Sequence, residues 1–401
     1  MCAFAPDKLS APDAGQPYAI TRRGTIMAPR PGDPLEAEGV LNPAAARGRD
    51  GVLYLFPRLV AKGNYSRIGI ARVRFNAAGD PTAVERLGVA LEPRESYEQN
   101  PLTGGGVEDP RITYFEPDDC YVMTYTAFSA EGPRIALATS KDLFSWQRLG
   151  LVRFAPGPVD MDAVDNKDAV LFPRLITDPR GRPALGLIHR PRFPGSMLLR
   201  FVAGVGLQRP SDTAVDPAAG VSALRELGTA VARGTRRLNH ESIWMSYAAP
   251  GVLGGELVFS GHRRVMSPRA RWERIKVGVG TPPLAASGGW VLLYHGVGFQ
   301  GQHGVRYSAG AMVLDANHPE VLRYRSGRAV LVPGVGERTG IVPDVVFPTG
   351  ADRRHDLGQP DRLDVYFGAA DDRIDVGSLH LPAELPAPHW RMAPGGDEQA
   401  A

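Results

Sequence analysis

The sequence is poor in cysteine and contains no long apolar run. Its 401 residues include only Cys2 and Cys120, too few for a disulfide framework, and this scarcity suits a reducing compartment. Nowhere do 18 apolar residues follow one another, so no membrane-spanning helix is expected. The first twenty residues, MCAFAPDKLSAPDAGQPYAI, contain acids and prolines where a secretory signal needs an unbroken apolar core. We therefore expect a cytoplasmic protein with no membrane partner.

The chain also lacks a dense basic block and the familiar short catalytic motifs. Lys plus Arg exceed Asp plus Glu by only 46 − 43 = 3, and the arginines are scattered, whereas a nucleic-acid surface needs clustered cations. There is no HExxH pair, no cysteine pair at metal-ligand spacing, no P-loop and no nucleophile elbow. The sequence therefore predicts no nucleic-acid partner, no metal and no organic cofactor.

Short alternating apolar segments dominate the chain. The 47 glycines and 36 prolines divide it into many brief pieces, which disfavours long helices. Each piece is rich in β-branched or aromatic residues and is bounded by turn residues, as is typical of strands. The predicted strands cover residues 51–60, 67–75, 120–128, 134–140, 289–297, 310–315 and 363–370. This pattern indicates an all-β protein.

A polar residue followed by an apolar strand recurs near Asn42, Asp109, Lys167, Gly280 and Asp344, at spacings of 67, 58, 113 and 64 residues. We attribute the long interval to an insertion at about residues 193–240, which holds the best helix candidate, residues 210–234, itself broken by proline and glycine. Five units of about sixty residues then remain, each long enough for four strands. The sequence thus predicts one domain over residues 1–401, a five-bladed β-propeller.

The segment GGGVEDPRITYF (104–115) carries two adjacent acids ahead of a strand. Pro110 biases Asp109 away from the right-handed helical region, so we expect extended or turn geometry, with Glu108 and Asp109 on opposite sides. Two carboxylates this close raise at least one pKa, as a general acid working near neutral pH requires. The alternative is an acidic turn paired with Arg111.

Cationic side chains gather at two other strand ends. Lys167 lies in NKDAVLFPR, and His189 with Arg190 ends the apolar run LGLIHRP. Arginine and lysine are natural phosphate ligands, so these residues could form an anion site. A surface salt-bridge patch is the alternative.

Tyr294 and His295 in YHGV end a further strand. The four tryptophans Trp146, Trp244, Trp272 and Trp290 are expected in the core or between blades.

Several of these segments, in this order, resemble glycoside hydrolase family 130, the β-mannoside phosphorylases and related β-mannosidases. The similar motifs extend over about 330 residues: NPAA (42), GVEDPRIT (106), RIALATSKDLFSW (134), NKDAVLFPR (166), HRP (189), ESIWMSY (241), GTPPL and GWVLLYHGV (280–297), YSAGAMVLD (307) and GIVPDVVFPTG (340). The resemblance implies a five-bladed propeller that acts on β-mannosides.

The resemblance further implies that Asp109 is the sole protein acid and protonates the glycosidic oxygen through the mannosyl 3-hydroxyl. Inorganic phosphate, the co-substrate, would attack the anomeric carbon and invert the linkage, giving α-mannose 1-phosphate and a shortened acceptor. A second carboxylate base is then unnecessary, because phosphate is already an anionic nucleophile.

The implied phosphate ligands are Arg67, Lys167, His189 and Arg190, and the implied substrate ligands are Asn42, Arg58, Glu108, Asp168, Tyr294, His295 and Asp344. Glu241, close to a motif, keeps a hydrolytic β-mannosidase as an alternative, and a non-catalytic sugar-binding propeller is another. The number of subunits stays open, although members of the family commonly self-associate.

Overall fold

The computed structural model describes residues 16–100, 104–157, 160–193, 240–251, 253, 255, 257–300 and 304–387. Within these ranges it is built from strands joined by turns, with no α-helix, as the sequence predicted. The brief 3-10 turns are η1 (Pro34–Glu36), η2 (Ser96–Glu98), η3 (Glu116–Asp118), η5 (Arg271–Glu273), η6 (Val335–Arg338) and η7 (His355–Leu357). No described helix is both long and apolar enough to cross a bilayer.

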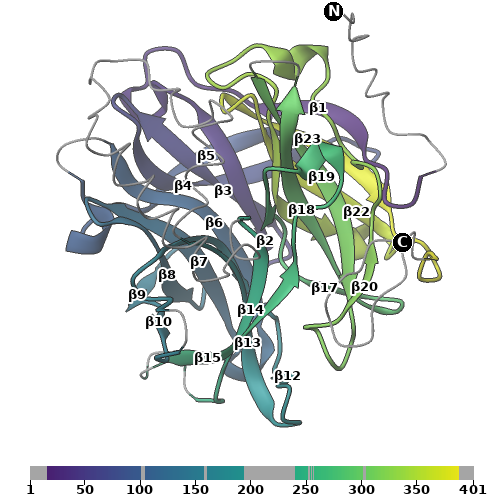
Figure 1. Ribbon diagram of the computed structural model, residues 1–401. Helices are drawn as coiled ribbons and strands as arrows, with labels where there is room; N and C mark the ends of the chain where they lie inside the picture. Colours follow the sequence, from purple (N-terminus) through teal and green to yellow (C-terminus); the bar gives the residue numbers. More distant parts are fainter. Residues whose placement is uncertain are drawn as a thin grey trace, which may run out of the picture.

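The strands form five antiparallel blades, and the first two blades lie on the left in Figure 1. Blade I contains β2 (Val40–Arg47), β3 (Leu53–Ala61), β4 (Tyr65–Phe75) and β5 (Pro81–Leu91). Blade II contains β6 (Gly105–Phe115), β7 (Cys120–Ser129), β8 (Gly132–Ser140) and β9 (Gln147–Leu151). A short parallel pairing of β4 with β6 joins these two blades.

The other three blades complete the ring (Figure 1). Blade III contains β11 (Asp165–Leu171), β13 (Pro183–Arg192), β14 (Ile243–Ala248) and β15 (Val258–Met266), with the short strands β10 (Arg153–Phe154) and β12 (Ile176–Thr177) at its edges. Blade IV contains β16 (Lys276–Val279), β18 (Gly289–Gln300), β19 (Gly304–Leu314) and β20 (Leu322–Arg325), with β17 (Leu284–Ala286) beside β18. Blade V contains β21 (Val346–Arg353), β22 (Arg362–Ala369), β23 (Arg373–His380) and β1 (Thr21–Met27).

The core lies between the blades. Among the described residues, five apolar clusters fill the five spaces between successive blades, and the last of them packs blade V against blade I. Trp272 and Trp290 lie between blades III and IV, whereas Trp146 and Trp244 border other clusters. The predicted packing role of the tryptophans is therefore confirmed, and the ring of blades is closed.

The predicted strands and the five units of four strands are confirmed. The insertion at about residues 193–240 and the helix candidate 210–234 fall mainly on residues 194–239, which lie outside the described residues. The prediction of one domain over residues 1–401 stays a prediction.

We call β2, β6, β11, β16 and β21 the inner strands. Their final residues meet around one hollow of about 470 Å³, lined among others by Arg47, Tyr114, Arg174 and Asp352. We call this end of the channel the opposite mouth. The end at which the inner strands begin is the funnel mouth, and it carries Asn42, Asp109 and Lys167.

Ring closure depends on β1, because the first described strand is the outermost strand of the last blade and pairs with β23. Met27 of β1 is 3% exposed and packs in the cluster between blades V and I. Met27→Ala should lower the free energy of unfolding by about 2–5 kcal/mol, because it removes buried methylenes and leaves a cavity. Urea denaturation measures this change. The control is Thr21→Ala, at the exposed start of the same strand; equal effects of the two substitutions would contradict a stabilising role of closure.

Candidate active site

Three inner strands contain a left-handed residue near the funnel mouth. Asn42, Asp109 and Asp168 have φ of 46°, 46° and 53°, and the pairing of each strand with its neighbour shifts register at that point. Asparagine and aspartate are the non-glycine residues that best tolerate this conformation. Each bulge interrupts the alternation of side chains and brings a polar group toward the other blades.

The fifth repeat differs from the sequence interpretation. Asp344 also has a positive φ, of 61°, but it precedes β21, and the register shift in that strand lies between Pro348 and Gly350. Asp344 is therefore not the structural counterpart of Asn42 and Asp109. It lies at the rim, where its carboxylate is 3.7 Å from the Arg306 guanidinium.

Asp109 and Glu108 lie on the same side of the strand. Arg58 donates to Glu108 Oε1 at 2.8 Å and to Asp109 Oδ1 at 3.4 Å, and Asn42 Nδ2 donates to Asp109 Oδ1 at 2.8 Å. The expectation that the two acids face opposite sides is wrong, because the left-handed bulge at Asp109 breaks the two-residue alternation.

Gly106 explains part of the glycine run ahead of the two acids. Its φ is +111°, and a Cβ there would lie 2.2 Å from the Ser66 carbonyl oxygen. Only glycine permits this close approach of β6 to β4. The approach places Glu108 beside Arg58, whose Nε donates to Ser66 Oγ at 2.9 Å.

Arg111 joins three blades across the channel. Its guanidinium donates to the carbonyl oxygens of Asp109 at 2.8 Å, Gly280 at 3.1 Å and Val279 at 3.0 Å, and it lies 3.7 Å from the Asp168 carboxylate. Since Arg111 bonds the Asp109 backbone instead of its side chain, it holds the bulge in place and leaves the Asp109 carboxylate to Asn42 and Arg58. The alternative of a simple Asp109–Arg111 turn pair does not describe this arrangement.

Further charged groups surround these residues. Arg190 donates from Nε to Asp168 Oδ2 at 2.5 Å and pairs with Glu241, while His295 Nε2 lies 3.6 Å from Asp168 Oδ2. A Cβ at Gly278 would collide with both Asp168 and His295, so glycine is needed there. We define the funnel cluster as Asn42, Arg58, Glu108, Asp109, Arg111, Lys167, Asp168, Arg190, Glu241, Lys276, His295 and Asp371.

The cations of the funnel cluster shift the pKa values of its acids. Burial raises the pKa of Asp109, but Arg58, Arg111 and Lys167 offset this and leave that pKa below its ordinary value. Burial and the neighbouring Asp109 raise the pKa of Glu108 above its ordinary value, despite Arg58. The expected upward shift thus falls on Glu108, whereas Asp109 is ionised near neutral pH in the free protein.

Lys167 is the best candidate for an anion ligand. Burial lowers the pKa of its ammonium, an effect that Glu108, Asp168 and Asp109 oppose. Within the described part of the chain, its ammonium has no hydrogen bond or ion pair. Lys167 is therefore a cation that lies near several carboxylates and is bonded to none of them.

Besides Asp344 at the rim, the structure leaves three predicted ligands outside the cluster: His189, Tyr294 and Arg67. His189 is fully buried and bonded through its two ring nitrogens to Asn166 at 3.1 Å and Ser246 at 2.8 Å. Burial lowers its pKa to about 3, so it is neutral. Strand alternation places it on the other face of β13 from Arg190. This geometry places His189 outside the funnel cluster, and its phosphate-binding role stays a prediction from the resemblance.

Tyr294 and Arg67 have other partners as well. The Tyr294 hydroxyl donates to Glu273 at 2.9 Å, and its ring lies in the cluster between blades III and IV, on the other face of β18 from His295. Arg67 donates to Glu92 at 2.6 Å and lies over the Tyr65 ring. Within the described residues, neither forms a hydrogen bond or ion pair with the funnel cluster.

Two members of the cluster were missed by the sequence interpretation. Asp371, in the turn between β22 and β23, interacts electrostatically with Arg58, Asp109 and Lys276, and burial raises its pKa to about 6. Lys276, at the start of β16, lies 4.8 Å from the centre of the Tyr307 ring. Ala370 and Asp371 are consecutive left-handed residues in this tight turn, and the acidic pair that follows the apolar strand in GAADD is the only sequence signal for it.

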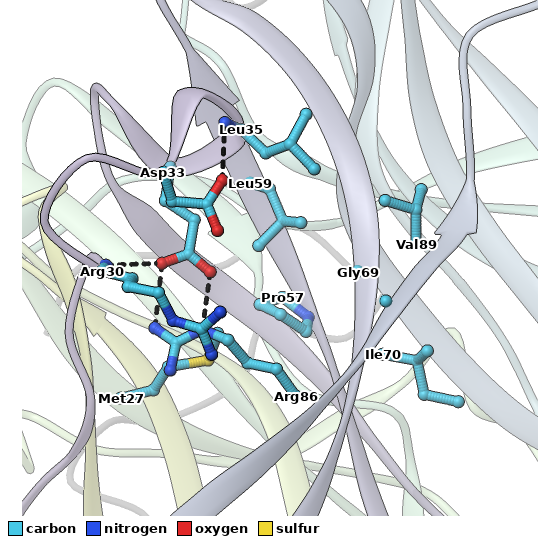
Figure 2. A pocket seen from close by; sticks show the side chains of 12 residues that line it. Met27, Arg30, Asp33, Leu35, Pro57, Leu59, Gly69, Ile70, Arg86 and Val89 are labelled. Atoms are coloured by element: carbon cyan, nitrogen blue, oxygen red, sulfur yellow. Dashed lines mark hydrogen bonds and ion pairs between the residues drawn. The ribbon is translucent and has the colours of Figure 1, made fainter.

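Two hollows in the described part of the chain lie away from this cluster. The hollow at the opposite mouth is separated from it by Arg111 and its three carbonyl partners. Figure 2 shows the other, of about 200 Å³, at the side of blade I, where Arg86 donates to the buried Glu36 at 2.7 Å. It contains none of the predicted site residues. Among the described residues, no group of three or more His, Cys, Asp or Glu side chains could hold a metal ion.

Comparison with known proteins decides the family. Residues 29–182 and 233–383 match glycoside hydrolase family 130, described as beta-1,4-mannooligosaccharide phosphorylase. The chain belongs to glycoside hydrolase family 130. The two matched ranges leave out residues 183–232, most of the predicted insertion.

Two relatives that are named as mannoside phosphorylases match different shares of the chain. A 1,2-beta-oligomannan phosphorylase of Thermoanaerobacter sp. is 27% identical over 364 residues, 89% of this chain and 95% of that protein. A beta-1,4-mannooligosaccharide phosphorylase of Ruminococcus albus is 38% identical over 116 residues, 29% of this chain and 33% of that protein.

Solved family 130 structures share the fold. The beta-1,2-mannobiose phosphorylase of Listeria innocua, in complex with beta-1,2-mannobiose, has a TM-score of 0.62 at 22% identity and covers 90% of this chain and 97% of its own. A structure from work on family 130 hydrolases that target beta-1,2-mannosidic linkages has a TM-score of 0.63 at 19% identity, with 94% and 98% covered. At these identities the likeness establishes the fold alone.

Arg111 should be essential to the stability of the channel. Arg111→Met leaves three backbone carbonyls without their donor and Asp168 with one cation fewer, so we expect a loss of about 3–5 kcal/mol in unfolding free energy. Urea denaturation checks this value. The matched control is Arg180→Met on an exposed turn, where a change within about 0.5 kcal/mol is expected. A similarly small change for Arg111→Met would refute the bridging role.

Proposed function

We propose that this protein is an inverting β-mannoside phosphorylase. The observation that carries the proposal is the pairing, at one mouth of the channel, of the Asp109 carboxylate with the unbonded Lys167 ammonium and with Arg190 behind it. Phosphate bound by Lys167 attacks the anomeric carbon while the bond from that carbon to the glycosidic oxygen breaks. Asp109 supplies the proton that the departing oxygen takes up, through the mannosyl 3-hydroxyl.

Asp109 must be protonated to act as the acid, yet its pKa is lowered in the free protein by Arg58, Arg111 and Lys167 despite its burial. Phosphate binding would oppose this lowering of the pKa. An anion beside Lys167 adds negative charge near Asp109 and occupies one of the cations that hold its pKa down, so the Asp109 pKa rises. The acid therefore becomes competent when the nucleophile is in place.

Asn42, Arg58, Glu108, Asp168 and His295 are proposed to hold or position the mannosyl ring. Arg58 donates to Glu108, Asn42 donates to the neighbouring Asp109, and His295 lies 3.6 Å from Asp168. Asp371 completes the set from blade V. The cytoplasmic location, self-association and the lack of a cofactor stay predictions from the sequence.

Phosphate dependence tests the proposed reaction directly. Incubating the protein with β-1,2- and β-1,4-linked manno-oligosaccharides should release sugar only when inorganic phosphate is present, and the product should be α-mannose 1-phosphate. NMR of the product identifies the anomer and the phosphate ester. Release of free mannose at equal rates with and without phosphate would instead identify a β-mannosidase, and binding without turnover would identify a sugar-binding module.

Two substitutions separate acid catalysis from phosphate binding. Asp109→Asn should lower kcat by about 10²–10⁴, the usual contribution of a general acid. Lys167→Ala should raise KM for phosphate roughly ten- to hundredfold, the loss of a charged hydrogen bond of about 1.5–3 kcal/mol, with a much smaller change in KM for the mannoside. Steady-state kinetics with each substrate varied measures both effects.

The control for each variant changes another side chain of the same chemical type. Glu108→Gln alters the adjacent carboxyl, whose raised pKa makes it the competing proton donor. If Glu108→Gln abolishes turnover and Asp109→Asn does not, Glu108 is the acid. Lys141→Ala removes an exposed lysine near the opposite mouth and should leave KM for phosphate unchanged.

A further inference from the structure

The β18–β19 hairpin rises above the inner strand of its own blade. β16 pairs with β18 only as far as Lys276 opposite Val297, whereas β18 continues to pair with β19 through Phe299 and Gln300. The extra residues extend past the funnel mouth. Phe299, the residue before the end of this extension, is 51% exposed.

The segment that leads into β21 borders the same part of the mouth. Val342 donates from its backbone to the Ala370 carbonyl oxygen at 3.0 Å, so this segment lies on the turn that carries Asp371 of the funnel cluster. Ile341, directly before it, is 59% exposed. We define the acceptor rim as Phe299, Gln300, Arg306, Ile341 and Asp344.

Polar groups lie between the two apolar side chains of the rim. In the amide orientation that satisfies both neighbours, Gln300 donates to Asp344 Oδ2 at 3.1 Å and accepts from Arg306 Nη2 at 2.7 Å. The Tyr307 backbone donates to the Asp344 carbonyl oxygen at 3.0 Å, and Lys276 of the funnel cluster lies over the Tyr307 ring. The rim is thus continuous with the cluster.

Two exposed large apolar side chains, Phe299 and Ile341, lie at this rim. The described chain exposes six such residues: Tyr114, Phe144, Val258, Phe299, Val335 and Ile341. Tyr114 lines the hollow at the opposite mouth, Phe144 lies in the turn between β8 and β9 at that same end, and Val258 begins the outer strand β15. Val335 lies in η6, which the outer strands β1 and β23 of blade V bind through Arg22 and Arg373. An aromatic face beside an amide and a carboxylate suits a sugar ring, which has apolar C–H faces and hydroxyl edges.

The stereochemistry of the proposed reaction explains why a sugar should lie here. Inversion requires the nucleophile and the leaving group on opposite faces of the anomeric carbon. Lys167 and Arg190, which would hold phosphate, belong to blade III. In a five-membered ring, the side across from blade III is the side of blades V and I, and the acceptor rim borders it from blades IV and V.

We propose that the acceptor rim binds the leaving sugar of the β-mannoside, with Phe299 as its stacking platform; this inference rests on the proposed phosphorylase function. The rim acts on the acceptor alone. It contributes nothing to the binding of the mannosyl ring or of phosphate, which lie at the funnel cluster.

The synthetic direction tests the rim separately from the cluster. With α-mannose 1-phosphate as donor and mannobiose as acceptor, Phe299→Ala should raise KM for mannobiose by about tenfold, equal to about 1.4 kcal/mol, and leave KM for the donor unchanged. The matched control is Phe144→Ala, whose side chain is also 51% exposed but lies at the far end of blade II. Equal kinetics of the two variants, or a parallel rise in both KM values for Phe299→Ala, would overturn the proposal.

Failure of the proposed function has a different signature. If the wild-type protein neither forms nor uses α-mannose 1-phosphate, the phosphorylase proposal fails, and calorimetric binding of mannotriose to the same proteins then decides the rim. Weaker binding by Phe299→Ala than by Phe144→Ala supports a sugar-binding rim. Equal binding, or no binding by the wild-type protein, contradicts it.

Discussion

The left-handed bulge in the inner strands is the constraint on which the site depends. In a regular strand, Glu108 and Asp109 would point to opposite faces, and Arg58 could reach only one of them. The positive φ of Asp109 turns both carboxylates to one side. This conformation costs backbone free energy unless its surroundings hold it. Arg111 supplies that hold by donating to the Asp109 carbonyl oxygen and to the carbonyls of a facing blade, so the geometry of the carboxylate is a property of the whole ring.

The electrostatics of the cluster couple its two proposed substrates. Cations keep the pKa of Asp109 low in spite of burial, whereas burial keeps the pKa of Asp371 at about 6. A site with so many opposed buried charges is sensitive to any further ion, because the local dielectric is low. An anion at Lys167 shifts the balance toward protonated carboxyls. In the proposed reaction, a sugar that arrives without phosphate would meet an ionised Asp109, and this would disfavour unproductive cleavage.

Much of the architecture could be predicted from the sequence because strand periodicity and repeat spacing are local or regular signals. The same period-two pattern also shows where sequence reasoning fails. In each of the doublets His189–Arg190 and Tyr294–His295, adjacent residues must face opposite sides of a strand, so only one of each pair can reach the channel. The structure selects Arg190 and His295. A sequence motif contains both residues of a doublet, and the sequence alone does not show which of the two faces the channel.

Asp371 could not be predicted from strand periodicity or motif resemblance, because its place in the site depends on ring closure. It lies in a turn of blade V, and it approaches Arg58 of blade I only because β1 completes that blade and packs it against the first. Sequence separation between the two residues is nearly the whole described chain. Asp109, Lys167 and Arg190 come from the adjacent blades II and III, but the other members of the funnel cluster draw on all five blades. Closure, which the apolar clusters between blades stabilise, is therefore the step that brings the turn carboxylate of Asp371 beside Arg58.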